Sequence, residues 1–419
     1  MTISLTQVIT NLQADIDAVD SDTSMDQILK YMHRARSLTE INSVYDSAGV
    51  MPTDSAYDGM LAFSKSDNTM YKFVDSSIDG GTIFAWHQAD SNVASSAGGS
   101  TTNLYGTTAV YKAGGQADLS PYKVNSIEKV PVASDGNTTD VGDLVTVSTG
   151  YELGNSGPTD GFASGGRAGA PTYGVGTTVV QIDKYPFASD TNAADTGDLF
   201  KSRGGAATNN GPTYAYQSFG SSTPAATEGS ISKFPYAISD GTGTDVGDIH
   251  PTYSPTGMAN AGGSSDTTHA YVGGGYAPAV PWPQMNLIQR FSFATDENAS
   301  DVGDALTAGI YYTVSGHQST THGYITGGIG GPSSPGRKND ITKYPFAASG
   351  ADAADAADLT VARYGLAGAS STTHAYGLGG NDPSGNANTV DKYTVTSDAN
   401  ATDVGDLATV TSIAAGAQS

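Results

Sequence analysis

The sequence predicts a mainly-β repeat protein with the architecture of a β-propeller, preceded by a short α-helical segment. Three observations predict this fold. A motif rich in aspartate and glycine occurs six times, about 50 residues apart. A run of alternating apolar and polar residues precedes each copy, which is the pattern of a β-strand. Small-residue runs and glycine pairs recur in the same units, so each unit supplies about four short strands, as a propeller blade does.

The composition of the chain limits the classes of function that we expect. The 419 residues carry a formal net charge of -23 at pH 7, and a nucleic-acid backbone would repel so acidic a protein. There is no cysteine, so neither disulfides nor thiolate metal sites are available. The sequence shows no signal-peptide pattern, and no apolar run approaches the length of a membrane span. We therefore expect a soluble protein with no nucleic-acid partner and no membrane insertion.

The repeated motif first occurs as "ASDGNTTDVGDL" at 133–144. Its further copies occupy 188–199, 238–249, 294–306, 348–359 and 396–407. The runs before these copies, such as "QIDKYPF" and "DITKYPF", alternate apolar or aromatic residues with lysine and predict the third strand of each unit. "RYGLAGASS" and "THAYGLGG" are typical of the first two strands, and "TDVGDL" of the fourth. The recurrent proline indicates a strand end or edge.

The two ends of the repeat region indicate how the ring closes. Residues 59–86 contain three degenerate strands, "MLAFSK", "TMYKFVD" and "TIFAW", without a first strand. Residues 409–419 supply a small-residue first strand in "IAAGAQS" and then stop. We expect these parts to pair, so that 59–419 forms a seven-bladed propeller closed by 59–86 and 409–419. The alternative is a six-bladed ring with 59–86 outside it.

Residues 1–58 differ in kind and predict two α-helices. Apolar residues recur there at spacings of four and three, as in a short coiled-coil seam, at Leu5, Ile9, Leu12, Ile16 and Val19. Ser24 and Gln27 form a capping box at the start of the second helix. Either the helices pack on the protein's own surface, or they form a segment for docking and oligomerisation.

The layout of the units resembles that of kelch repeats. In "THAYGLGG" a pair of glycines ends the second strand, "VDKYTV" forms the next strand, and a polar turn with Gly-Asp-Leu follows. The tryptophan that kelch repeats usually carry in the last strand is absent from all six units. The sequence is therefore kelch-like and lacks the complete kelch motif.

The helical N-terminal segment, followed by the run "SAGVMPTDSAYDGMLAFSKSDNTMYKFVD", resembles fibre and appendage proteins of tailed bacteriophages. The repeats resemble virion proteins of marine phages. The resemblance implies a non-enzymatic virion protein, located in the tail or another external appendage, whose tail-fibre or tail-tip module contacts the host surface. Its N-terminal helices would bind other virion proteins, and the chain would be a homo-oligomer in the particle.

Two alternatives to that function remain open. The first is a capsid fibre, decoration protein or tail adaptor with a purely assembly role. The second is a cell-surface glycan hydrolase, which would need a pair of acidic residues in a sugar-sized cleft. No Gly-x-Ser-x-Gly motif occurs, and the aspartates are too numerous for any pair to be singled out as catalytic.

The aspartate-rich motif has two interpretations. Asp135, Asn137, Asp140 and Asp143 place oxygen atoms along a turn, in loose resemblance to a calcium loop. Such side chains also bond to backbone amides in tight turns. The fifth copy has Gly350 in place of the first aspartate, which favours the turn. We therefore expect no cofactor, with calcium as the alternative.

The connections between the second and third strands vary from unit to unit. Because the chain reverses at each strand, these variable connections share one face of a propeller, where we expect a host glycan or protein to bind. The candidate ligand-binding residues are Tyr173, Tyr276, Trp282 and Arg337. Trp282 stands between two prolines and could stack on a sugar ring or cover an apolar blade edge.

Overall fold

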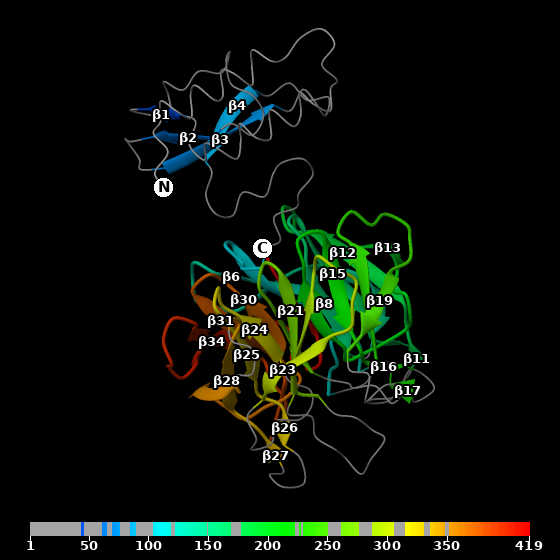
Figure 1. The fold of residues 1–419 in the computed structure, drawn as a ribbon. Coiled ribbons are helices and arrows are strands. Elements are labelled where there is room, and N and C mark those ends of the chain that lie inside the picture. The colour runs from blue at the N-terminus through cyan, green and yellow to red at the C-terminus, as the bar shows by residue number, and fades with distance from the viewer. Residues whose placement is uncertain are drawn as a thin grey trace, which may run out of the picture. The chain divides into compact units, whose positions relative to one another are not determined.

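Figure 1 shows the computed structural model of the chain, which divides into two compact units, Met1–Gly99 and Ser100–Ser419. Of residues 1–103 the structure describes only four strands. From residue 104 on it describes all residues except 119–121, 149, 169–176, 223–225, 228, 250–260, 276–286, 306–314, 331–335 and 348–351. The helices predicted within 1–58 lie outside the described residues.

The first unit contains a four-stranded sheet of order β1-β2-β3-β4. β1 (Ser43–Tyr45) is parallel to β2 (Leu61–Ser64), and β3 (Thr69–Asp75) and β4 (Phe84–Gln88) continue the sheet in antiparallel fashion. β2, β3 and β4 coincide with the three degenerate strands predicted within 59–86. Among the described strands, their pairing partners all belong to this sheet.

The second unit is a six-bladed β-propeller whose blades are four-stranded antiparallel sheets. From the inner to the outer strand, blade 1 consists of β36 (Ala415–Gln418), β5 (Ala109–Ala113), β6 (Val124–Pro131) and β7 (Thr139–Ser148). Blade 2 consists of β8 (Glu152–Ser156), β9 (Asp160–Gly165), β12 (Gln181–Pro186) and β13 (Ala194–Asp198). Blade 3 consists of β14 (Ala207–Asn210), β15 (Tyr214–Ser218), β18 (Ser230–Pro235) and β19 (Thr244–Asp248). Blade 4 consists of β20 (Gly262–Ser265), β21 (His269–Gly273), β22 (Leu287–Ser292) and β23 (Ser300–Asp304). Blade 5 consists of β24 (Ser315–Gln318), β25 (His322–Thr326), β28 (Asp340–Pro345) and β29 (Ala354–Asp358). Blade 6 consists of β30 (Ala367–Ser370), β31 (His374–Leu378), β34 (Thr389–Thr394) and β35 (Thr402–Asp406).

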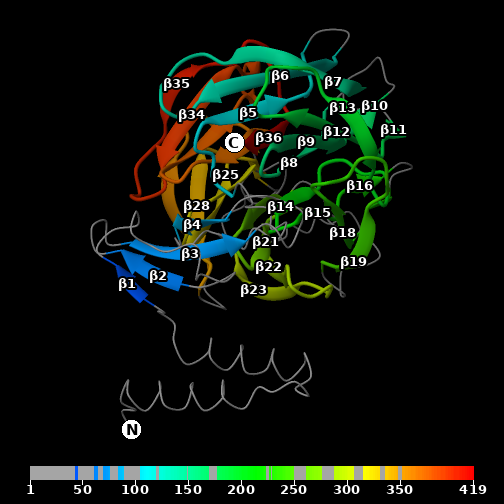
Figure 2. The same ribbon diagram turned by 90° about the horizontal axis from the view of Figure 1, so that it is seen from above.

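The inner strands pack around a common axis in the order β36, β8, β14, β20, β24, β30 and back to β36. In Figure 2 the colour runs once around this ring, from cyan at β5 through green and yellow to red at β35. The prediction of a mainly-β propeller is confirmed. The ring has six blades, as the alternative prediction stated, and not seven. Each blade contains one of the six copies of the aspartate-rich motif, which precedes or enters its outer strand, and the strands within 59–86 form a separate sheet.

β36 closes the ring by pairing antiparallel with β5, so that Ala415 lies opposite Ala113 and Gln418 opposite Val110. The sequence predicted that this C-terminal strand pairs with 59–86, whereas its partner in the structure is β5. Blade 1 takes only its second, third and fourth strands from 109–148, and its inner edge is therefore free for β36. The pairing removes two exposed sheet edges and joins the first and last parts of the ring.

Glycine in the inner strands allows their backbones to approach closely at the axis. A Cβ atom on Gly416 would lie 2.2 Å from the carbonyl oxygen of Gly368. A Cβ atom on Gly154 would lie equally close, 2.2 Å, to the carbonyl oxygen of Gly416. Neither position has room for a side chain, which explains the small-residue pattern of the predicted first strands.

The hydrophobic core lies between neighbouring blades. The aromatic residue after lysine in the third strands is buried, as at Tyr185 and Tyr344. Tyr271 of blade 4 stacks on Phe346 of blade 5 with ring centroids 4.6 Å apart. Aromatic pairs of this kind add about 0.5–1.5 kcal/mol beyond the area that they bury. Each blade therefore depends on the next one for the burial of its faces.

Candidate functional site

The ring has two different faces, because neighbouring strands of each blade are antiparallel. The connections from second to third strands emerge where the inner strands begin, at what we term the loop face. Within the described residues, four of them carry small hairpins, namely β10–β11 (Arg167–Ala168, Thr177–Thr178), β16–β17 (Ser221–Ser222, Ala226–Thr227), β26–β27 (Ile329–Gly330, Gly336–Arg337) and β32–β33 (Asn381–Asp382, Gly385–Asn386). The connections from first to second and from third to fourth strands emerge at the opposite face.

A closed ring of hydrogen bonds surrounds the axis where the inner strands end. In each blade the backbone N–H of one residue donates to the side-chain oxygen of its counterpart in the next blade, over distances of 2.9 to 3.2 Å. In ring order the six residues are Ser156, Asn210, Ser265, Gln318, Ser370 and Gln418. The inner strands are therefore held in register by polar contacts as well as by packing.

The segment at 104–108 covers this end of the axis, which we term the tether face because the chain enters the ring there. The carbonyl oxygen of Leu104 accepts hydrogen bonds from the side-chain amides of Gln318 and Gln418, at 2.6 and 3.0 Å. The Tyr105 hydroxyl donates to the carbonyl oxygen of Ser319 at 2.9 Å. The approach of the chain to the ring is thus fixed at the tether face, opposite the variable connections.

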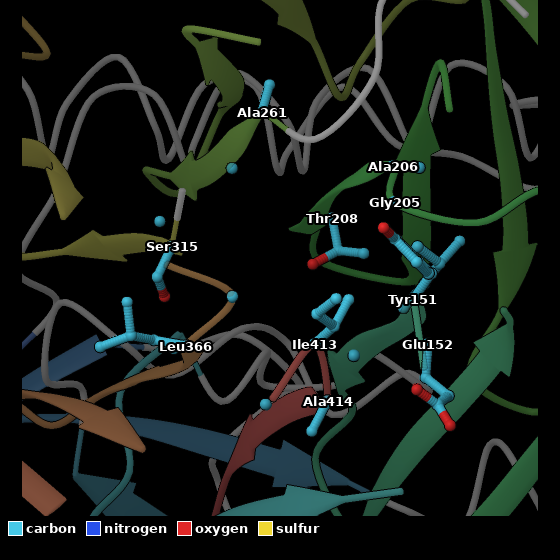
Figure 3. A pocket seen from close by; sticks show the side chains of 17 residues that line it. Tyr151, Glu152, Gly205, Ala206, Thr208, Ala261, Ser315, Leu366, Ile413 and Ala414 are labelled. Carbon is cyan, nitrogen blue, oxygen red and sulfur yellow. The ribbon is translucent and has the colours of Figure 1, made fainter. Parts of the chain in front are cut away.

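A small pocket lies on the axis at the loop face. Figure 3 shows Thr208, Ser315, Leu366 and Ile413 arranged around it, with Glu152 at its margin. The Glu152 carboxylate accepts the backbone N–H of Gly115 at 3.1 Å. The pocket measures about 100 Å³, whereas pockets for small organic ligands usually measure about 300–1,000 Å³. It has room for water molecules and not for a sugar.

Arg337, a predicted ligand-binding residue, connects two blades at the loop face. It lies on β27 of blade 5, and its guanidinium donates to the backbone and side-chain oxygens of Asn381 of blade 6, at 3.1 and 2.6 Å. The same guanidinium lies 5.4 Å from the ring centroid of Tyr364. The basic group is therefore used to hold the β26–β27 hairpin against the next blade.

Other variable connections are joined to their neighbours in the same way. The side chain of Asn386 on β33 donates to the carbonyl oxygen of Gln116 of blade 1 at 2.6 Å, and its backbone N–H donates to Asp118 at 2.7 Å. Arg167 on β10 donates to Ser221 on β16 at 3.3 Å. These contacts link blades 2 and 3 and, with Arg337, blades 5, 6 and 1.

The end of the aspartate-rich motif forms a bulge in each outer strand, where the pairing with the third strand shifts register. Asp140 accepts the backbone N–H of Gly142 at 3.2 Å, where the strand pairing shifts register and Gly142 adopts a φ of 157°. The equivalent bond to the glycine two residues later recurs at Asp195, Asp245, Asp301 and Asp403. This carboxylate therefore has a structural partner in five of the six blades.

The other polar residues of the motif bond to a neighbouring blade. Asn137 accepts the backbone N–H of Asp406 of blade 6 at 3.0 Å, and the N–H of Asp143 donates to Asn192 of blade 2 at 3.1 Å. The same contact recurs at the pairs Asp248–Asn298, Asp304–Asp352 and Asp358–Asn400. The motif thus connects consecutive blades at the perimeter of the ring.

Asp135 forms an ion pair with Lys392 of blade 6. Equivalent pairs between consecutive blades are Lys129–Asp190, Lys233–Asp296 and Lys343–Asp398. The four calcium candidates therefore lie in one short segment. Their contacts stabilise the fold, through the side chains of Asp135, Asn137 and Asp140 and through the backbone of Asp143. Within the residues that the structure describes, no group of three or more His, Asp or Glu could hold a metal ion.

Two ion pairs buried inside the ring were not predicted. Lys112 pairs with Glu128 at 3.2 Å and Arg363 with Asp391 at 2.7 Å, and all four side chains are 0% exposed. Burial by itself would raise the pKa of Glu128, but the Lys112 ammonium and hydrogen bonds from Thr138, Lys112 and Thr409 hold it below its usual value. The sequence did contain a sign of these pairs, because Glu128 in "SIEKVPV" and Asp391 in "TVDKYTV" are acidic residues at positions where the strand pattern points inward.

The remaining candidate residues lie outside the described part of the chain. They are the ligand-binding candidates Tyr173, Tyr276 and Trp282 and the docking residues Leu5, Ile9, Leu12, Ile16 and Val19. These assignments stay predictions from the sequence.

No protein-family model matches this chain, and a search of curated proteins finds no match. Within the residues that the structure covers, no helix is long and apolar enough to cross a membrane.

Proposed function

We propose that this chain is a non-enzymatic structural protein of a bacteriophage virion, and that its propeller is a tail-fibre or tail-tip module that contacts the host surface. Its N-terminal segment binds other virion proteins, and the chain is a homo-oligomer in the particle. The sequence supports this through its resemblance to phage appendage proteins. The polarity of the ring supports it too, because the chain enters at the tether face and the variable hairpins project from the loop face.

The proposal rests on the hydrogen bonds that join variable connections to neighbouring blades. Arg337 and Asn386 join three consecutive blades at the loop face, and Arg167 joins two others. Connections that are ordered before a partner arrives lose less conformational entropy when they bind it. A rigid ring whose described hairpins are held in place on one face suits recognition of a surface.

The charge of the perimeter favours particular partners. Each outer strand contributes two aspartates, namely Asp140, Asp143, Asp195, Asp198, Asp245, Asp248, Asp301, Asp304, Asp355, Asp358, Asp403 and Asp406. A ring of negative charge repels anionic partners at long range. A neutral surface glycan, or a protein with basic patches, is therefore the partner that we propose for the loop face.

The experiment compares two aromatic substitutions in the particle. Trp282→Ala removes the aromatic side chain of a variable connection, and adsorption to host cells is expected to weaken about ten- to a hundredfold, by analogy with the loss of a stacked base. Phe200→Ala is the matched control, because Phe200 is exposed and lies in the connection from blade 2 to blade 3. Thermal unfolding of both purified variants verifies that the ring is intact.

Antibody labelling of intact particles locates the chain independently of adsorption. Label on a tail or appendage, together with weaker adsorption of Trp282→Ala and unchanged adsorption of Phe200→Ala, supports the proposal. Unchanged adsorption of a particle that carries both Trp282→Ala and a shortened 329–340 connection would instead favour the assembly-only role. Release of reducing ends from purified envelope glycans would favour the hydrolase.

A further inference from the structure

A second, larger groove lies at the tether face between blades 5 and 6. It is bordered by the turn before β25 in blade 5 and by the aspartate-rich turn of blade 6, and it measures about 370 Å³. This volume falls within the range of about 300–1,000 Å³ that small-molecule sites occupy. The axial pocket, at about 100 Å³, does not. The groove is also distinct from the variable connections, which emerge at the opposite face.

The groove contains a charge-balanced ion pair. Lys343 Nζ of blade 5 donates to both carboxylate oxygens of Asp398 of blade 6, at 2.5 and 2.6 Å. The Asp398 side chain is 53% exposed and that of Lys343 is 27% exposed. A carboxylate accepts about four hydrogen bonds, so Asp398 can accept further donors while it remains paired. The pair offers both donors and acceptors and adds no net charge.

Neutral polar groups surround this pair. His322 Nδ1 lies 2.8 Å from the Thr321 hydroxyl. Burial, assisted by Lys343 and opposed by Asp398, lowers the pKa of His322, so the imidazole is neutral at pH 7. The hydroxyls of Thr372 and Thr396 border the groove from blade 6. Hydroxyls and a neutral imidazole donate and accept hydrogen bonds, as the hydroxyls of a sugar do.

The floor of the groove is rigid and partly apolar. The Tyr324 hydroxyl donates to the carbonyl oxygen of Val395 at 3.1 Å, across the junction of the two blades. The Tyr324 ring also packs edge-on against Tyr393, with centroids 5.9 Å apart. A site whose walls are already ordered loses little entropy when a ligand binds.

From this combination we propose that the groove between blades 5 and 6 binds a neutral, hydroxyl-rich ligand the size of a monosaccharide unit. The sugar hydroxyls bond to Asp398, Lys343, His322 and the threonine hydroxyls, and the ring lies over Val395. An anionic sugar is disfavoured because Asp398 already neutralises Lys343 and the protein carries a net charge of -23. The proposal does not depend on the proposed function, since it concerns another face of the ring.

The junction between blades 3 and 4 supplies a natural comparison. It has the same ion pair, Lys233 with Asp296 at 2.6 Å. Tyr214, however, stands at the position of His322, and its ring centroid lies 4.7 Å from the Lys233 ammonium. An aromatic ring thus occupies the place of the imidazole beside the lysine. A substitution at this junction is therefore a matched control for one at the groove.

The test uses the full chain and measures binding of glucose, galactose, mannose and N-acetylglucosamine by calorimetry and by saturation-transfer NMR. At least one of these sugars is expected to bind with a dissociation constant on the order of 1 mM, as suits a ligand of about a dozen heavy atoms. Thr372 is exposed, and Thr372→Trp fills the groove. This variant is expected to weaken binding at least about tenfold. Thr267→Trp places the same side chain in the equivalent turn of blade 4, at the junction of blades 3 and 4, and is expected to leave binding unchanged.

A second variant tests the chemistry of the groove. Asp398→Asn keeps the shape of an exposed side chain but removes the charged acceptor, and it is expected to weaken sugar binding about tenfold or more. Failure of all four sugars to bind at about 50 mM would overturn the proposal. It would also be overturned if Thr372→Trp bound as the wild type does, or if glucuronic acid or sialic acid bound more tightly than every neutral sugar.

Discussion

Replacing Glu128 by glutamine tests whether buried contacts between blades stabilise the closed ring. The Glu128 carboxylate accepts hydrogen bonds from Lys112 Nζ at 3.2 Å and from the Thr138 hydroxyl at 2.6 Å. It also accepts the backbone N–H groups of Ala408 and Thr409, at 2.8 and 3.1 Å. These last two residues lie in the connection from blade 6 to β36. One side chain of blade 1 therefore binds the chain just before the strand that closes the ring.

The expected cost follows from the burial of the ion pair. Glutamine has nearly the shape of glutamate, but it removes the charge and replaces one acceptor oxygen by a donor. Lys112, which is 0% exposed, then loses its bonded counter-ion. Removing one partner of a buried pair costs about 3–5 kcal/mol of unfolding free energy. At about 2 °C per kcal/mol for a large domain, the unfolding midpoint falls by about 6–10 °C.

A double variant separates the buried charge from the packing. Lys112→Met combined with Glu128→Gln removes both charges at similar volume. Replacing a buried pair by neutral side chains costs less than leaving one charge without its partner. The double variant is therefore expected to be more stable than Glu128→Gln alone by about 2 kcal/mol. With Lys112→Met measured as well, the three variants give the coupling energy of the two residues.

The assay is urea unfolding of the full chain, followed by circular dichroism. Asp135→Asn is the matched control, because it also removes a carboxylate of blade 1, but one that is 56% exposed and pairs with Lys392 of blade 6. Such an exposed pair contributes about 0–1 kcal/mol. The reasoning is refuted if Glu128→Gln costs no more than Asp135→Asn, or if the double variant is less stable than Glu128→Gln.

Two further predictions concern the same closure. The folded-state pKa of Glu128 lies below its unfolded value of about 4.3, so its contribution is complete above that pH and is lost as the pH falls through the folded pKa. The difference in urea midpoint between the wild type and Glu128→Gln should accordingly shrink below about pH 4, and a constant difference down to about pH 2 would contradict this. Gly416→Ala places a Cβ atom 2.2 Å from the carbonyl oxygen of Gly368 and should cost about 1–3 kcal/mol or more in urea unfolding. Gly241→Ala, whose Cβ would meet only Ile238 at 4.0 Å, should change stability by less than about 0.5 kcal/mol, and equal effects of the two would show that the axis has room.

The repeat and its strands could be predicted because their signals are local. Alternation of apolar and polar side chains determines which residues form strands. The hydrogen bond from the Gly142 N–H to the Asp140 carboxylate joins residues only two positions apart. The same signals recur in each unit and predicted the propeller correctly. They did not determine the number of blades, because a strand pattern shows that a segment pairs but not which sheet edge it joins.

The partners of the motif could not be predicted, because they lie on other blades. Asn137 bonds to Asp406, which is 269 residues away along the chain, and no local pattern relates the two. The structural contact of Arg337 could not be predicted for the same reason, since its partner Asn381 belongs to the following blade. A basic residue in a variable connection was a sound candidate for ligand binding, and only the packing of the two hairpins shows its structural contact.

The sequence by itself thus determined the kinds of element in this protein: alternating strands, small-residue inner strands and turns that need aspartate and glycine. The tertiary structure decided which edge receives β36, which carboxylates are buried with a cation, and where a groove of ligand size remains. The physical reason is that strands and turns depend on side-chain alternation and backbone conformation within a few residues. Closure, ion pairs and grooves depend on surfaces from consecutive blades, which meet only when the ring is complete.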